Sequence, residues 1–595
     1  MRVADIVANS IYEHGTKDVF CLVGGGSMFL NDALGHNPNL KVTFMEHEQA
    51  CSMAAEGYVR ASGRMAAVCV TTGPGGTNAI TGVLGAFQDN YPMLVVSGQV
   101  RYPTCIDSTG LPLRFLGEQE HNIVDTVKPL TKYAVMVKKP EDALFEVEKA
   151  IYIANEGRRG PTWVDIPMDI QNAQVEPENL RHFVPEAKKS NWDKEVFIRE
   201  IRQSKCPVIL TGSAIRSTGY TDKFRKLAEK MGIPVLAATY NGDLFPNDHP
   251  DYYGGFGIIG GRAGNLMMQN ADLIIGMGCR MAYRQIGFNY EQFSPDSRRM
   301  VIDADPAELK KSTLRIDVPF CVDLREVIDD LLGVDLDLDL AGKKQWLAYC
   351  NALRDRFSMY QDKFENVVPG QVNPYYFAQH MKKHLKDDSV IVLGNSTIAA
   401  HFLQLGIEKP DQRIINNMNC GSMGYDLPAA AGAAVAINDD VILATGDGSI
   451  MLNLQELMTI KHYNLPVKIF ISSNGGYRGV VRSQTNMFGH FTGCTPDTGV
   501  GMPDFSKIAN AFDIPFFKIK EQSEVDETID KVMSVKGPVI CEWPQDPDQL
   551  IEPRVMNRRS ETGTIVSTPI DDLSPFLDRD EYEQLQYPNW VKNNG

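Results

Sequence analysis

The sequence lacks the features that define several large classes of protein. Its 11 cysteines include no Cys-X-X-Cys pair and no His/Cys metal-ligand spacing, so we expect reduced core thiols rather than a disulfide framework. A net charge of −16 offers no basic surface for nucleic acid. The longest apolar run, residues 427–437, is too short to span a bilayer. The N-terminus shows no basic segment followed by an apolar run, so we expect no signal peptide. These absences favour an acidic cytoplasmic protein that contacts neither nucleic acid nor a membrane.

The pattern that is present alternates short β-branched runs with helical segments, and it contains no internal repeat. The predicted strands include VFCLV, AAVCVTT and PMLVVSGQV near the start, PVILTGS, IPVLAATY, DLIIGMG and RMVIDAD in the middle, and SVIVLGN, VILATGDG and VKIFISSN near the end. Continuous apolar runs separated by helices indicate parallel sheets covered on both faces. The three blocks predict an α/β fold with three doubly wound parallel-sheet domains.

Two polar segments divide the blocks. Residues 171–193 and 334–374 carry prolines or charges and little strand pattern. We predict domains at residues 1–172, 193–335 and 370–548, a division consistent with roughly 100–200 residues per domain. Residues 549–595 form a tail rich in Arg, Asp and Pro. The sequence leaves open whether this tail is solvated or lies across the other domains.

The strongest local motif lies in the third block, where VILATGDGSI is followed by VKIFISSNGGY. Asp447 and Asn474 each stand at the carboxyl end of a predicted parallel strand, and such ends share one edge of a sheet. A carboxylate beside a carboxamide suits Mg²⁺. Gly446 and Gly448 let the backbone approach a phosphate, and a helix start at Ser449 favours negative charge. The unit predicts a magnesium–diphosphate site, although GDG alone is equally a simple turn. The Walker pattern of phosphate-loop NTPases is absent.

GDG followed by Asn about thirty residues later resembles the signature of thiamine-diphosphate enzymes, and the surrounding residues resemble the acetolactate synthase branch. The resemblance implies that Asp447, Asn474 and the Gly476 carbonyl bind Mg²⁺. NCGSMGYDLPAAAGAAVA resembles the segment that holds the cofactor rings. Met423 would then bend the cofactor, although by itself it reads as a core methionine, and the Gly421 carbonyl would accept from the pyrimidine amino group. The cofactor-binding residues implied in this block are Asn395, Ser396, Gly421, Met423, Gly446, Asp447, Gly448, Ser449, Asn474 and Gly476.

The same resemblance requires a carboxylate that exchanges a proton with the cofactor's pyrimidine ring. KVTFMEHEQACSMAAEGYVRASG offers Glu46, Glu48 and Glu56. Helical spacing places Glu48 at a helix start near apolar residues, where burial would raise its pKa. HEQAC resembles the family's His-Glu-Gln motif, which makes Glu48 the catalytic activator. Glu46 and Glu56 are interpreted as surface or helix-capping carboxylates.

Two glycine-rich loops complete the first block. LVGGGSMFLNDAL resembles the loop that faces the substrate, which makes Gly26 a catalytic candidate. TTGPGGTNAITG resembles the loop that places Pro74 and Asn78 beside the pyrimidine, and Gln119 matches a substrate-side glutamine. The resemblance covers about residues 1–550. It implies a homodimer or homotetramer with active sites at the subunit interface.

The middle block leaves its ligand open. In acetolactate synthases this domain binds FAD that does no redox work. The positions that match are Arg158, Gly212, Arg280, Asp303 and Asp323. Residues 280–285 (RMAYRQ) and 254–261 (GGFGIIGG) depart from the flavin pattern. FAD and a ligand-free domain therefore both remain as alternatives.

The activity implied by the resemblance is decarboxylation of a 2-oxo acid, with pyruvate expected, and transfer of the acyl carbanion to a carbonyl acceptor. In GGYRGVVRSQTNMFGHF, Gln484 stands in the place of an acceptor-contacting tryptophan. Arg478 and Arg482 nearby suit carboxylate, phosphate or sugar oxygens. The tail resembles acetolactate-synthase-like proteins of surface-polysaccharide and branched-sugar pathways, which suggests a polar acceptor such as a keto-sugar. The alternatives are an acetolactate synthase, a simple 2-oxo acid decarboxylase and a non-catalytic homologue.

Overall fold

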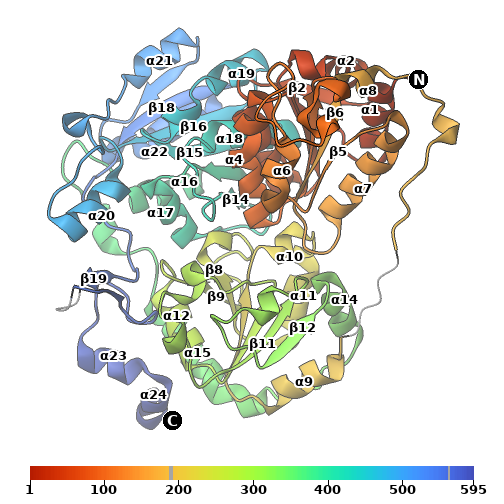
Figure 1. The fold of residues 1–595 in the computed structure, drawn as a ribbon. Helices are drawn as coiled ribbons and strands as arrows, with labels where there is room; N and C mark the ends of the chain where they lie inside the picture. The colour runs from red at the N-terminus through yellow and green to blue at the C-terminus, as the bar shows by residue number, and fades with distance from the viewer. Residues whose placement is uncertain (187–191, 560–562, 595) are drawn as a thin grey trace.

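Three six-stranded parallel sheets organise the chain, each with helices on both faces (Figure 1). The computed structural model describes residues 1–186, 192–559 and 563–594. The predicted fold of three α/β domains and a C-terminal tail is confirmed. No helix in these described ranges is long and apolar enough to cross a membrane.

The first sheet has the strand order β2(Lys41–Phe44), β1(Asp18–Cys21), β3(Ala66–Val70), β4(Met93–Gln99), β6(Pro161–Pro167), β5(Tyr133–Met136). Its strands alternate side chains between the two faces, so each face builds its own core. One core is completed by α1(Val3–Glu13), α2(Met28–His36) and α7(Ala143–Asn155). The other is completed by α3(Glu48–Ser62), α4(Pro74–Asp89) and α6(Ile123–Val127).

The third sheet repeats the order of the first, strand for strand. It runs β14(Arg413–Ile415), β13(Val390–Leu393), β15(Val441–Gly446), β16(Val467–Ser473), β18(Val539–Pro544), β17(Phe516–Lys518). One face carries α18(Asp426–Ile437), α19(Glu456–His462) and α21(Phe505–Ala511). The other carries α16(Pro374–Lys383), α17(Thr397–Leu405) and α22(Val525–Ser534).

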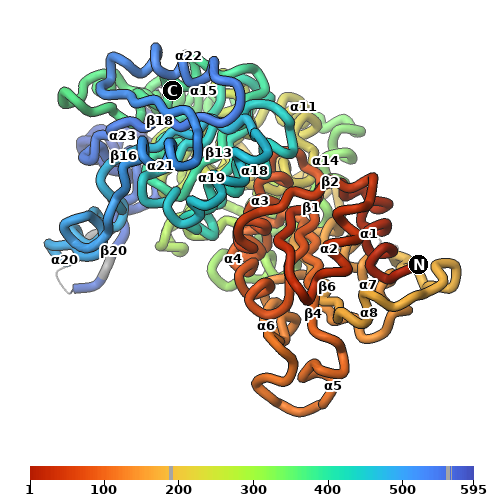
Figure 2. Tube along the Cα trace, turned by 90° about the horizontal axis from the view of Figure 1, so that it is seen from above, coloured from red at the N-terminus to blue at the C-terminus, as the bar shows by residue number. Residues whose placement is uncertain are grey.

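The first and third domains share one hydrophobic core through α3 and α18, which lie side by side (Figure 2). Two glycines allow the close approach. A Cβ on Gly57 would lie 2.3 Å from the Ala429 carbonyl oxygen, and a Cβ on Gly432 would lie 1.9 Å from that of Ala54. The two domains are therefore packed backbone to backbone.

This packing predicts that Gly432→Ala destabilises the protein. The added methyl would meet backbone at Ala54 that cannot swing aside, and overpacking of a core costs about 1–3 kcal/mol. Thermal unfolding would show a lower midpoint. Gly35→Ala is the matched control, since nothing lies within 4 Å of its added Cβ and alanine favours the helix. Equal midpoints for the two variants would contradict the expectation.

The central sheet has the order β12(Val318–Cys321), β11(Arg298–Asp303), β10(Leu273–Met277), β7(Pro207–Thr211), β8(Val235–Ala238), β9(Tyr252–Phe256). One face packs against α9(Lys194–Gln203), α11(Thr221–Met231) and α14(Leu324–Gly333). The other packs against α12(Arg262–Asn270) and α15(Lys344–Arg356). Helix α15 follows the predicted end of this domain at residue 335, yet it belongs to the central core.

The C-terminal tail lies across the central domain, which answers the question that the sequence left open. Its last helices are α23(Arg579–Leu585) and α24(Tyr587–Asn594). The Tyr587 ring packs edge-on against Trp346 at 5.1 Å between centroids, and Trp590 packs against Tyr349 at 5.4 Å. The tail therefore contributes aromatic side chains to the α15 face of the central domain.

Candidate functional site

The glycine-rich loops of the first domain meet at the carboxyl edge of its sheet. Gly26 donates its N–H to Thr71 Oγ1 at 3.1 Å, and its carbonyl accepts from Gln171 Nε2 at 2.7 Å. A Cβ at Gly73 would lie 2.0 Å from the Gln119 carbonyl oxygen, and Gly73 has φ +61°. The structure therefore brings the predicted residues Gly26, Pro74 and Gln119 to one edge, where Pro74 and Gln119 are exposed.

Glu48 is the first residue of α3 and is held by a neighbour from α4. Asn78 Nδ2 donates to Glu48 Oε2 at 3.1 Å. The His47 side chain caps the helix by accepting from Gln49 N at 3.1 Å, which fixes where α3 begins. We expected Glu48 to be buried among apolar residues, but it is only half-buried in the single chain. Its environment within this chain is therefore partly open, as a site that receives a cofactor ring requires.

The interpretation of Glu56 as a surface or capping residue is wrong. Glu56 is fully buried and accepts from Arg60 Nε at 2.9 Å and Nη2 at 2.6 Å. Arg60 also pairs with Asp89, and Asn419 of the third domain donates to the same aspartate. Burial raises the pKa of Glu56 to about 7, despite the opposing charge of Arg60. This ion-pair chain joins α3 to the segment that contains Gly421 and Met423.

The third domain places Asp447 and Asn474 together, as the parallel strands predict. Asp447 follows β15 and Asn474 follows β16. Asp447 Oδ2 accepts from the backbone N–H groups of Asn474 at 3.0 Å, Gly475 at 2.8 Å and Gly476 at 3.2 Å. Burial raises the pKa of the Asp447 carboxyl, and these N–H groups oppose the rise. The carboxylate thus fixes the backbone turn that carries Asn474.

The turn after β16 is one that only glycine accepts without strain. Gly475 has φ +78° and Gly476 has φ +122°, a region that other residues rarely adopt. A Cβ at Gly476 would also lie 2.2 Å from the Cys494 carbonyl oxygen. The two glycines allow the chain to fold tightly around Asp447.

Two buried polar side-chain atoms at this edge have no hydrogen-bond partner among the residues that the structure describes. They are Asn474 Oδ1 and Ser396 Oγ. A buried acceptor without a partner is costly, and an amide oxygen beside a carboxylate suits a hard cation. No three His, Cys, Asp or Glu side chains in the described ranges gather as a metal site, so a cation here would take further oxygens from backbone and phosphate. The donor set fits magnesium bound together with a diphosphate.

The remaining cofactor residues predicted from the sequence surround the same edge. Asn395 Nδ2 donates to the Gly421 carbonyl, and Ser449 Oγ accepts from Gly424 N at 3.3 Å. A Cβ at Gly446 would lie 2.9 Å from Ser396 Cβ, and one at Gly448 would lie 2.4 Å from the Tyr477 ring, with Met423 Cε at 3.7 Å. Gly446 and Gly448 therefore allow Ser396 and the Tyr477 ring to pack closely against the backbone of this turn.

The loop candidates Arg478, Arg482 and Gln484 each form hydrogen bonds with backbone atoms. Arg478 Nε donates to the Asn474 carbonyl at 2.6 Å. Arg482 Nη2 donates to the carbonyls of Pro547 at 2.8 Å and Gln549 at 2.5 Å. Gln484 Oε1 accepts from Thr492 N at 2.7 Å. These side chains shape α20(Arg478–Phe488) and fix it to the start of the tail.

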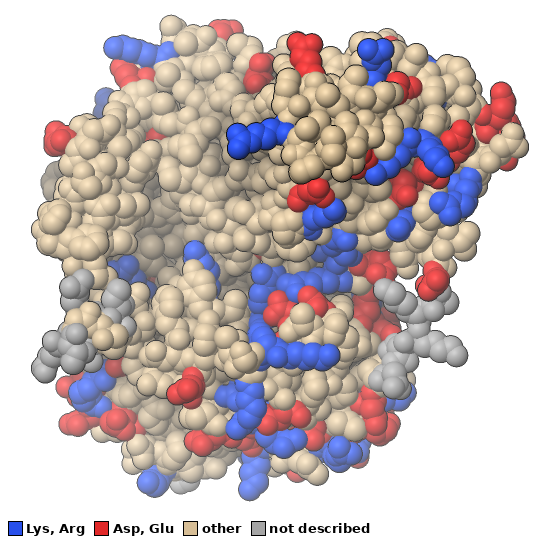
Figure 3. Space-filling model, in the orientation of Figure 1, with Lys and Arg blue, Asp and Glu red and all other residues tan. Residues whose placement is uncertain are grey.

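The central domain has a crevice at its topological switch point, between the ends of β7 and β10, where α/β sheets bind ligands. The inner cavity is about 130 Å³ and is lined by Gly212, Gly278 and Asp303. An outer groove of about 870 Å³ continues from it toward the first domain. Figure 3 shows Lys and Arg side chains gathered where these two domains meet. Ligand sites usually measure about 300–1,000 Å³, so the inner cavity alone is too small for a nucleotide, whereas the outer groove is within this range.

The residues of the crevice fit the chemistry of a nucleotide. Arg158, Arg159 and Arg280 line both the inner cavity and the outer groove, and guanidinium groups suit phosphates. Asp303 ends β11, where an acidic residue suits ribose hydroxyls. Asp323 is instead paired with Arg325 at 2.6 Å. FAD itself stays a prediction.

The chain matches the domain set of the thiamine pyrophosphate enzymes in order. Residues 1–110 match the N-terminal TPP binding domain, residues 195–331 the central domain and residues 393–543 the C-terminal TPP binding domain. The chain therefore belongs to the thiamine pyrophosphate enzyme family, and the predicted resemblance is confirmed.

Its relatives identify the branch. The chain is 30% identical over 574 residues to the probable acetolactate synthase large subunit of Methanocaldococcus jannaschii, with 93% of each chain covered. It is also 30% identical over 548 residues to the acetolactate synthase isozyme 3 large subunit of Escherichia coli, covering 89% of this chain and 92% of that one. Acetolactate synthase 1, chloroplastic, of Oryza sativa subsp. japonica is 30% identical over 559 residues, with 91% and 84% covered. The protein is a thiamine-diphosphate-dependent enzyme of the acetolactate synthase kind.

Proposed function

We propose that the enzyme decarboxylates pyruvate in a Mg²⁺-dependent reaction and transfers the two-carbon acyl unit to a polar carbonyl acceptor. The observation that carries the proposal is the pair Asp447 and Asn474, with the buried, unpartnered Oδ1 of Asn474. The Glu48–Asn78 contact at 3.1 Å supports the second part of the proposal, a carboxylate held in place to exchange a proton with the cofactor. The acidic composition and the cysteine pattern support a cytoplasmic location.

Bound thiamine diphosphate supplies the electron sink that stabilises the acyl carbanion after CO₂ leaves. Asp447, Asn474 and the Gly476 carbonyl would hold Mg²⁺ and, through it, the diphosphate. Glu48 would hold and return a proton at the pyrimidine ring, and Asn78 orients its carboxylate. The neighbouring edge residues have positioning roles: Pro74 and Met423 against the cofactor rings, and Gly26 and Gln119 on the substrate side.

We propose further that a second copy of the chain completes each active site in a homodimer or homotetramer. Exposed apolar side chains support this. Leu111 is 58% exposed and Phe115 is 62% exposed, on the loop after α5(Ile106–Thr109) that projects from the first domain (Figure 2). Phe44, Leu452 and Met458 are also exposed near the junction of the first and third domains. Apolar surface of this kind favours association with another chain.

Two acceptors compete. The named relatives are acetolactate synthases, which favours a second 2-oxo acid. The loop and tail favour a keto-sugar, because Gln484 stands where the acetolactate synthases have an acceptor-contacting tryptophan. Arg478 and Arg482 donate to backbone carbonyls and keep their positive charge, which suits a polar acceptor.

The test is to incubate the purified enzyme with thiamine diphosphate, Mg²⁺ and pyruvate, alone and with a second 2-oxo acid or a keto-sugar. CO₂ release and the mass of the product are measured. A product two carbons heavier than the keto-sugar supports the carboligase with a sugar acceptor. Acetolactate in every mixture supports the acetolactate synthase. No CO₂ from pyruvate under any condition contradicts the proposed donor.

A further inference from the structure

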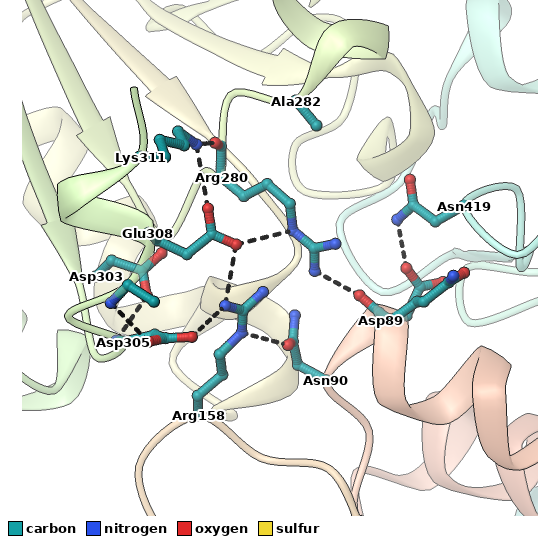
Figure 4. A network of polar contacts seen from close by, with 12 residues as sticks. Asp89, Asn90, Arg158, Arg280, Ala282, Asp303, Asp305, Glu308, Lys311 and Asn419 are labelled. Carbon is teal, nitrogen blue, oxygen red and sulfur yellow. Dashed lines mark hydrogen bonds and ion pairs between the residues drawn. The ribbon is translucent and has the colours of Figure 1, made fainter. Parts of the chain in front are cut away.

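Arg158 lies at the boundary between the inner cavity and the outer groove of the central crevice. Its Nη1 lies 2.8 Å from Asp305 Oδ2 and 3.0 Å from Glu308 Oε1, and its Nε donates to Asn90 Oδ1 at 2.6 Å (Figure 4). A nucleotide that spans both spaces has to pass this side chain. This arginine, which lines both spaces, is already paired with two carboxylates.

Glu308 is held in place by further cations. Its Oε2 lies 3.1 Å from Lys311 Nζ, and its Oε1 lies 3.8 Å from Arg280 Nε. Burial pushes the pKa of Glu308 upward, but Lys311, Arg158 and Arg280 together hold it below its usual value. Glu308 is therefore ionised at neutral pH and neutralises the cations around it.

The loop after β11 presents both acids to Arg158. Asp305 N donates to Asp303 Oδ1 at 2.9 Å, which bends the chain back over the strand end. Glu308 follows one turn later in η8(Glu308–Lys310). Asp303, the residue suited to a ribose, thus also shapes the segment that carries Asp305 and Glu308.

We propose that Asp305 and Glu308 act as internal competitors of a nucleoside diphosphate for Arg158, so that a nucleotide binds this arginine only in exchange for the protein's own anions. The two carboxylates take the place of the two phosphates, and binding requires Arg158 to exchange one set of anions for the other. The exchange is accessible from solvent, because the side chains of Arg158 and Asp305 are 27% and 32% exposed. This inference does not depend on which acceptor the enzyme uses.

Only molecules in which Arg158 is free can bind the nucleotide. The apparent Kd is therefore the intrinsic Kd divided by the fraction of such molecules. Removing one competing charge should therefore strengthen nucleotide binding, the opposite of what loss of a ligand contact would do. We expect Glu308→Gln and Asp305→Asn each to lower the Kd for ADP and for FAD about two- to fivefold, the effect of losing one partly exposed ion pair. Arg158→Gln should weaken binding of both.

Isothermal titration of the full-length protein with ADP and with FAD measures these affinities without any turnover. Glu200→Gln is the matched control, because Glu200 forms a 3.0 Å ion pair with Arg298 on the same sheet outside the crevice. Thermal unfolding checks that each variant is folded, and Asp305→Asn carries the test if Glu308→Gln is not. Affinities equal to that of Glu200→Gln, or no binding of either nucleotide by any variant, would overturn the proposal.

Discussion

Replacing Glu48 with Gln is expected to reduce CO₂ release from pyruvate by about 10²–10⁴-fold, the usual contribution of a positioned acid–base group. Glutamine retains the size of the side chain and an oxygen that accepts from Asn78 Nδ2, now at 3.1 Å from Glu48 Oε2. It cannot exchange a proton. The loss should therefore fall on the chemical step, and thiamine diphosphate should still bind.

Glu46→Gln provides the matched control for this prediction. Glu46 lies two residues earlier and is exposed, so the same substitution there should leave CO₂ release unchanged. Isothermal titration with thiamine diphosphate separates binding from chemistry. If Glu48→Gln retained more than about a tenth of wild-type release, another group would have to exchange the proton.

Replacing Asp447 with Asn is expected to weaken Mg²⁺ binding by more than about 100-fold, beyond the roughly 10–100-fold lost with an outer partner of a metal ligand. The amide oxygen can still accept from the three backbone N–H groups that Asp447 Oδ2 now receives. The turn should therefore persist while the negative charge is lost. Titration of activity and of cofactor binding against Mg²⁺ concentration measures the effect.

Asp439→Asn tests whether charge alone explains this result. Asp439 lies just before β15, at the end of the strand opposite Asp447, and pairs with Lys386 at 3.0 Å on the surface. Its loss should leave the Mg²⁺ dependence unchanged. A Mg²⁺ requirement that is the same in Asp447→Asn and in the wild type would remove Asp447 from the metal site.

The strands that the sequence reveals are those in the middle of each sheet. Continuous apolar runs such as β10 and β13 are buried on both faces, and this burial selects their composition. The edge strands β14 and β17 have three residues each and carry no such signal. Strand β6 is central but contains Asp165, a fully buried carboxyl that accepts from Ser97 Oγ at 2.5 Å. Burial raises the pKa of Asp165 to about 7, a cost that only the tertiary structure explains.

The site was predictable where local geometry decides it. Asp447 and Asn474 end adjacent parallel strands, so their proximity follows from the strand pattern alone. The burial of Glu56 does not, because it depends on how α3 packs against α4, where a Cβ on Gly85 would lie 2.7 Å from Glu56 Oε2, and on the cover that α18 gives to α3. The same is true of the matching strand orders in the first and third domains, since no repeated sequence accompanies them. Contacts between domains produce no periodic hydrophobic pattern in the sequence of either domain by which they could be predicted.

Helix α4 connects two places that are otherwise far apart. Its first residues include Pro74 and Asn78, beside Glu48, and its last turn reaches the central crevice. There Arg280 of the central domain donates to the Gln88 carbonyl, Asn419 of the third domain to Asp89, and Arg158 of the first domain to Asn90. Side chains from all three domains therefore bond to three consecutive residues. Sixteen helical residues span about 24 Å as one stiff body. The helix thus has one end at the crevice and the other beside Glu48. One rigid element therefore joins the residues around Arg158 to Asn78, the side chain that contacts Glu48.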